Sequence, residues 1–163
     1  IFCNPFLMRL KQSVHWKIFK INTRDNRGTY TINKLIGLKV KKLDLDCIGI
    51  SFKMRPELIG NFTRGNLHGG VVSSVLDVTG GMFALTGIIN KMKKQSFEEI
   101  SEKFSKIGTI DLRGDYLRAG FGNFFVSKGI ILRTGNTLSV TRMELHNDEG
   151  TLIAVVTGSY VVG

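Results

Sequence analysis

The stretch NLHGGVVSSVLDVTGG, residues 66–81, opens with a histidine and two glycines and then carries one carboxylate, Asp77, inside an apolar run. Residues 71–90 contain no proline and would form about five turns at 3.6 residues per turn, so the sequence predicts one long helix. This helix is apolar on nearly every side, and such a helix has to be covered from more than one direction. A strongly curved sheet would provide that cover.

Extended segments flank the predicted helix. Two alternating runs between Gly37 and Met54 predict a β-hairpin, and residues 56–67 predict a connecting loop. Residues 91–106 are highly charged and predict a second, exposed helical piece or an ordered connector. An antiparallel meander is predicted from four runs rich in β-branched and aromatic residues: 108–118, 123–133, 137–147 and 151–162. The order predicts an α+β domain with the helix packed on one antiparallel sheet.

The net charge of +10 favours a polyanionic partner, such as nucleic acid, an acidic membrane surface or a small ligand with several phosphates. Much of the excess lies in residues 1–35, so we predict a basic N-terminal segment there, ahead of one domain over residues 36–163. This segment has no helix-turn-helix, zinc or RNA-reading signature, which argues against a nucleic-acid partner. The apolar run carries Asp77 and several glycines, which argues against a membrane span.

Cysteine usage gives no sign of a disulfide framework or a metal site. Cys3 and Cys47 are isolated, and neither lies at ligand-like spacing from a histidine. We therefore predict a protein without a cofactor, and a reduced, cytoplasmic environment is the default expectation.

Asp77 has only small residues at helical spacing around it. These neighbours are Ser73, Ser74, Gly80, Gly81 and Ala84. A buried ionised carboxylate without partners would cost several kcal/mol, so Asp77 has to be paired, protonated or open to a ligand or water. The local pattern fits equally well a helix packed closely against a neighbouring backbone and a groove that receives a ligand.

The tripeptide before the helix adds a chemical possibility. His68, Gly69 and Gly70 stand where the helix should begin, and free backbone amides in a first helical turn can hold an oxygen with negative charge. Glycine lets a ligand approach that backbone closely. A lone histidine beside a turn is more often structural than catalytic. Amide donors at the helix start, combined with a carboxylate nine residues beyond the histidine, form a more specific pattern.

Three segments together resemble the hotdog-fold acyl-CoA thioesterases, and especially their PaaI-type group. They are LHGGVVSSVLDVTGG at 67–81, GTIDLRGDYLRAG at 108–120, and the run from Leu132 through RTGN to SVTRMELHNDEGTLIAV at 139–155. The resemblance covers about residues 35–162. It implies a sheet wrapped around one long helix, and two subunits that join their sheets edge to edge and share paired active sites. It also implies a homodimer or a homotetramer built as a dimer of dimers.

The resemblance also implies roles for particular residues. Gly69 would supply a backbone N–H to the thioester carbonyl, His68 would help to shape the site, and Asp77 would reach it from the partner subunit. Asp77 would then either activate a water as general base or attack the carbonyl itself. Members of this family often have Asn or Gln six residues before the histidine, where it positions water or substrate. Phe62 stands at that position here, so Asn61 would take this role only if the loop is one residue longer.

Further residues are expected to contact the substrate, which is predicted to be an acyl-CoA. Near the helix these are Gly70, Ser73, Ser74 and Gly81. The family resemblance implies that the turn Arg133, Thr134, Gly135 and Asn136 contacts the nucleotide of coenzyme A; an ordinary hairpin turn remains the alternative for each residue. Tyr116, Phe124, Phe125 and Met82 fit core positions better than an acyl tunnel.

The leading hypothesis is an acyl-CoA thioesterase of fatty acid metabolism that hydrolyses small to medium hydrophobic acyl groups. One alternative is a non-catalytic acyl-CoA-binding or sensing module whose basic segment contacts a macromolecule. A hydratase on the same scaffold ranks lower, because no paired histidine and carboxylate stands out. The choice between coenzyme A and a carrier protein stays open.

Overall fold

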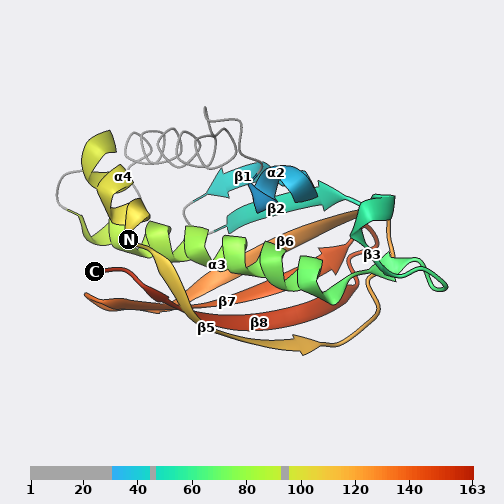
Figure 1. Ribbon diagram of the computed structural model, residues 1–163. Helices are drawn as coiled ribbons and strands as arrows, with labels where there is room; N and C mark the ends of the chain where they lie inside the picture. The colour runs from blue at the N-terminus through green and yellow to red at the C-terminus, as the bar shows by residue number, and fades with distance from the viewer. Residues whose placement is uncertain (1–30, 45–46, 93–95) are drawn as a thin grey trace.

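The structure, a computed structural model, describes residues 31–44, 47–92 and 96–163. Most of the predicted basic segment, residues 1–30, lies outside these described residues. One long helix, α3 (Gly69–Lys91), runs along the inside of a curved antiparallel sheet (Figure 1). The sheet has six strands: β1 (Lys39–Asp44), β2 (Cys47–Lys53), β5 (Gly108–Tyr116), β6 (Phe124–Thr134), β7 (Leu138–Asn147) and β8 (Leu152–Val161). The predicted hotdog arrangement is confirmed.

The apolar character of α3 is explained by the sheet that curves around it. Buried and less buried positions alternate along β7, so Met143 and Leu145 point inward. They join Phe125 of β6 and Leu76 and Phe83 of α3 in one core. By length and composition α3 could cross a membrane, because an 18-residue stretch of it has a mean hydropathy of 1.6. However, 67% of that stretch is buried inside the molecule. It is the central helix of the fold.

The strand order corrects the predicted four-strand meander. The order is β1-β2-β6-β7-β8-β5, so β5 pairs with β8 and only β6, β7 and β8 follow one another. The connection after β5 passes across the end of the sheet instead of turning back in a hairpin. There Leu117 and Arg118 donate their amides to the carbonyl of Ile153, and Gly120 accepts from Leu67. As a result β5 lies at one edge of the sheet and β1 at the other.

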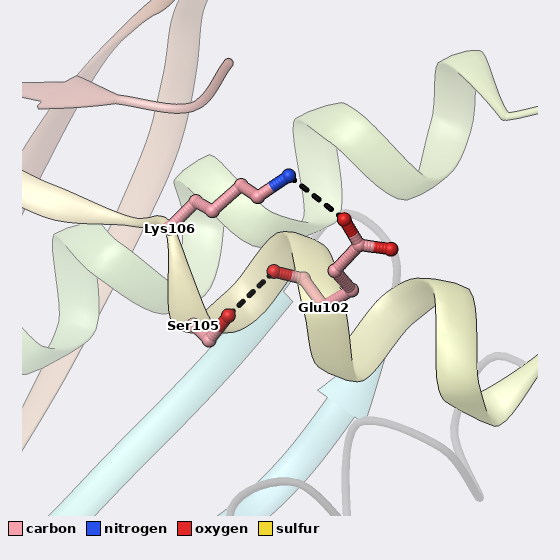
Figure 2. A network of polar contacts seen from close by, with 3 residues as sticks. All are labelled: Glu102, Ser105 and Lys106. Atoms are coloured by element: carbon pink, nitrogen blue, oxygen red, sulfur yellow. Dashed lines mark hydrogen bonds and ion pairs between the residues drawn. The ribbon is translucent and has the colours of Figure 1, made fainter.

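Residues 91–106 contain a helix that is less exposed than predicted. Helix α4 (Phe97–Ser105) starts with a capping box between Ser96 and Glu99, and Ile100 is buried against the end of α3. On its outer face Lys106 forms an ion pair with Glu102 at 2.8 Å, and Ser105 donates to the Glu102 carbonyl (Figure 2). The amphipathic face of α4 is therefore used to cover the C-terminal part of α3.

Two segments near the start of α3 contain short elements that the sequence analysis did not predict. The predicted loop at 56–67 forms a short 3-10 helix, η1 (Pro56–Leu58), and a small hairpin of β3 (Ile59–Asn61) and β4 (Asn66–Leu67). A short helix, α2 (Ile32–Ile36), crosses the predicted boundary between residues 35 and 36 and buries Ile36 in the main core. It ends at Gly37, whose φ of 76° is the left-handed conformation that glycine adopts at least cost.

Candidate active site

The turn that begins α3 is held in place on both sides. His68 donates its amide to Leu58 at 2.8 Å, and its ring Nδ1 accepts from the amide of Gly70 at 2.9 Å. A Cβ on Gly60 would lie 2.7 Å from the His68 Cα, so the β3 backbone presses directly against this turn. Among the described residues the amide of Gly69 has no acceptor. This amide points from the positive end of a long helix and can bind an oxygen that carries negative charge.

Tyr116, at the end of β5, lies over this glycine. Its hydroxyl donates to the Gly69 carbonyl at 3.0 Å and also contacts the hydroxyl of Ser73. Tyr116 and Phe124 are 54% and 37% exposed, which corrects their assignment to the core, whereas Phe125 and Met82 are buried as expected. Sequence reasoning missed the position of Tyr116 because 47 residues separate it from Gly69. Only the path of β5 brings the two together.

Asp77 lies two turns further along α3, beside the other end of β5. Its Oδ1 accepts from the hydroxyl of Thr109 at 2.8 Å, and its main-chain carbonyl accepts from Tyr160 at 3.2 Å. Burial, followed by the negative charge of Asp77, raises the pKa of Tyr160 above its usual range, because both disfavour the phenolate. Tyr160 therefore acts as a neutral donor beneath the helix. Asp77 itself is half-buried.

The small residues around Asp77 do not form one open groove. Gly80 is buried, and a Cβ there would lie 2.1 Å from the Tyr160 hydroxyl. The absence of a side chain at Gly80 therefore leaves room for Tyr160 of β8. Ser73 and Ser74 donate their hydroxyls to the helix carbonyls of Gly69 and Gly70, at 3.2 and 2.8 Å. Gly81 is half-buried beside the Tyr160 ring.

Gly69 and Asp77 do not meet within one chain. Eight residues separate them, and at 1.5 Å per residue this places them about 12 Å apart along the helix axis. One carbonyl group cannot contact both at that separation. A site that uses both residues needs a second subunit.

Asn61 lies at the start of a turn. Its Oδ1 accepts from the amide of Thr63 at 3.0 Å and from the hydroxyl of the same residue at 2.6 Å. These two hydrogen bonds hold the tight connection between β3 and β4. Phe62, next to it, is 92% exposed. The suggested role of Asn61 toward water or substrate stays a prediction.

The turn Arg133, Thr134, Gly135 and Asn136 lies at the opposite end of α3 from Gly69. Lys91, the last residue of α3, donates its ammonium group to the carbonyls of Thr134 and Gly135. Gly87 packs against Thr134, and it lies about 27 Å along the helix from Gly69. The suggested contact of this turn with the nucleotide of coenzyme A stays a prediction.

Two pockets flank the His68–Gly70 turn. The Tyr116 pocket, of about 370 Å³, is lined by Gly69, Tyr116, Arg118 and their neighbours. The α2 pocket, of about 480 Å³, is lined mainly by Ile32, Leu35, Ile36, Leu58, Val71 and His68. Within the described parts of the chain, no group of three or more histidine, cysteine or acidic side chains could hold a metal ion.

Comparison with known proteins identifies the family. Residues 64–154 match the model of the thioesterase superfamily. The chain is 38% identical over 131 residues to the medium/long-chain acyl-CoA thioesterase YigI of Escherichia coli K12, which covers 80% of this chain and 84% of that protein. YigI of Salmonella typhimurium is also 38% identical over the same shares.

A solved structure agrees with both matches. A Shewanella oneidensis protein related to the thioesterase superfamily superposes with a TM-score of 0.85 and 41% identity, over 94% of this chain and 98% of that one. Its likeness extends beyond the segment matched by the family model and includes most of the described fold. The chain belongs to the thioesterase superfamily and is a thioester-hydrolysing enzyme.

Proposed function

We propose that this enzyme hydrolyses acyl-CoA thioesters with a hydrophobic acyl chain of medium length, at sites shared between two subunits. The substrate class is supported by the relative YigI, which carries the name medium/long-chain acyl-CoA thioesterase. The observation that carries the mechanism is the amide of Gly69, which has no acceptor within the described part of the chain and stands at the start of α3 beside an open pocket.

The edge strand β5 supports a two-subunit site. Its first part holds Asp77 through Thr109, and its last residue, Tyr116, lies over Gly69. If two copies of β5 paired antiparallel about Leu112, the middle of the strand, Thr109 would stand opposite residue 115 of the partner subunit, next to the partner's Tyr116. Asp77 would then approach Gly69 of the partner subunit. The exposed Ile110 and Leu117 would be covered by the same contact.

In this site the two groups act on one carbonyl. The Gly69 amide donates to the carbonyl oxygen and stabilises the negative charge that develops there. One strong donor of this kind lowers the activation free energy by about 3–4 kcal/mol. With Asp77 as general base, a water oxygen attacks the carbonyl carbon and its proton passes to the carboxylate. The carbon–sulfur bond then breaks, and the thiolate of coenzyme A takes up a proton. With Asp77 as nucleophile, its carboxylate attacks the carbonyl carbon and the carbon–sulfur bond breaks, so that the thiolate of coenzyme A leaves and takes up a proton. Water then cleaves the acyl–aspartyl anhydride, which releases the free acid and restores the Asp77 carboxylate.

The decisive experiment measures thiol release from decanoyl-CoA by the purified wild type and by Asp77→Asn. The amide retains an oxygen that can accept from Thr109 but cannot serve as base or nucleophile, so kcat/KM should fall about 10²- to 10⁴-fold. Glu149→Gln, an exposed carboxylate in the β7–β8 turn, is the control and should keep wild-type turnover. An Asp77→Asn enzyme that is folded and fully active would refute the mechanism.

A further inference from the structure

The α2 pocket adjoins the same turn as the proposed catalytic amide. Gly69 lines the Tyr116 pocket, whereas the next residue, Gly70, lines the α2 pocket. His68 also lines the α2 pocket, and its ring is fixed by the hydrogen bond from the Gly70 amide. A substrate carbonyl held at Gly69 therefore stands between two cavities, and each is available to one arm of a thioester.

The walls of the α2 pocket are mainly apolar, and Arg55, Glu57 and Ser74 are also among the lining residues. The apolar part is built by Ile32, Leu35 and Ile36 of α2, Leu58 of η1 and Val71 of α3. Ile36 and Leu58 are buried, while Ile32 and Leu35 are 48% and 58% exposed. These two side chains leave apolar surface in water that an apolar ligand would cover.

The wall formed by α2 is anchored to the rest of the protein. The guanidinium group of Arg55 donates to the Leu35 carbonyl near the end of α2, and Ile36 is inserted in the main core. The Thr31 side chain caps the start of the helix. The pocket is therefore lined by ordered elements on both sides, which suits a binding surface that is formed before the ligand arrives.

We infer that the α2 pocket binds the acyl chain of the substrate and that α2 sets the preference for chain length. This inference rests on the proposed function. The other pocket suits the pantetheine arm better, because it adjoins Gly69 and includes Arg118 among its lining residues. Each methylene group buried in the α2 pocket should raise kcat/KM about fourfold, until the chain outgrows the cavity.

The test compares kcat/KM for decanoyl-CoA with kcat/KM for butyryl-CoA. Ile32→Asp introduces a charge into the pocket wall, yet an aspartate suits this first position of α2, so the helix is retained. Leu35→Ala removes apolar surface with a residue that favours helix. Each variant should lower the decanoyl-to-butyryl ratio at least about tenfold.

Ile130→Asp is the matched control. Ile130 is 55% exposed on β6 and lines neither pocket. The decanoyl-to-butyryl ratio of kcat/KM for this variant should therefore stay within about twofold of the wild-type ratio. An unchanged ratio in both pocket variants, with an active wild type, would place the acyl chain elsewhere and overturn this inference alone. A folded wild type that hydrolyses neither substrate would overturn the proposed function and this inference together.

Discussion

At the residue scale, the proposed mechanism needs a backbone group, the Gly69 amide, as well as the side chain of Asp77. The amide of Gly69 meets no acceptor in the residues that the structure describes, because it belongs to the first turn of α3, where no earlier carbonyl lies in helical position. The adjacent amide of Gly70 is already used by the ring of His68. One donor therefore remains for the substrate, and Tyr116 holds the Gly69 carbonyl from the other side.

Removal of this amide should lower turnover sharply while the helix is retained. Proline lacks the N–H and is well accepted at the first position of a helix, and His68, with φ −68° and ψ 135°, has a conformation that can precede proline. We expect Gly69→Pro to lower kcat about 10²- to 10³-fold. Gly69→Ala keeps the amide, and its Cβ would lie 3.5 Å from Tyr116, an ordinary contact. If both variants lost activity equally, the loss would reflect shape and not the missing donor.

Tyr160 should make the stability of the protein depend on alkaline pH. A free tyrosine has a pKa of about 10, and burial together with Asp77 raises the pKa of Tyr160 in the folded chain. Below pH 10 both states hold the proton. Above it only the unfolded state loses it, so the free energy of unfolding should fall by up to about 1.4 kcal/mol per pH unit. Urea unfolding between pH 9 and 11 should show a shallower fall for Tyr160→Phe. Equal slopes would contradict this assignment.

At the scale of the elements, α3 combines two different uses of small residues. Gly80 lets β8 approach the helix, because the Tyr160 hydroxyl occupies the space of a Cβ. A Cβ on Gly81, the next residue, would lie 3.9 Å from its nearest neighbour, an atom of the Tyr160 ring. The same dipeptide thus contains one position needed for packing and one that has room.

The two glycines should respond oppositely to alanine. Gly80→Ala forces Tyr160 and Met143 to move and should destabilise the protein by about 1–3 kcal/mol in urea unfolding. Gly81→Ala meets no close atom and improves helix propensity, so it should be neutral or stabilising by up to about 1 kcal/mol. Equal losses at both positions would mean that the helix packs against the sheet differently from this structure.

At the scale of the whole molecule, the position of β5 at the sheet edge is what the proposed two-subunit site depends on. It contacts both Asp77 and Gly69, which are too far apart on α3 to act together within one chain. Two-fold pairing of β5 with a second copy would join each carboxylate to the other subunit's amide.

Mixed dimers can test this sharing directly. Asp77→Asn and Gly69→Pro are each inactive alone in the proposed mechanism. A dimer with one subunit of each kind has one site with both groups intact and one site with neither. Random mixing by joint refolding makes about half of the dimers of this kind, so activity should recover to about a quarter of the wild type. No recovery, with mixed dimers confirmed by mass spectrometry, would show that Asp77 acts within its own chain.

The sequence alone determined the central helix, its start at the glycine pair, the antiparallel strands and the family, because these follow from local periodicity and from a compact motif. Tertiary structure decided what lies beside that motif. It placed β5 at the sheet edge, Tyr116 over Gly69, Thr109 on Asp77 and Tyr160 under Gly80. Those contacts join residues 32 to 83 positions apart, and they depend on strand order, which no local pattern specifies.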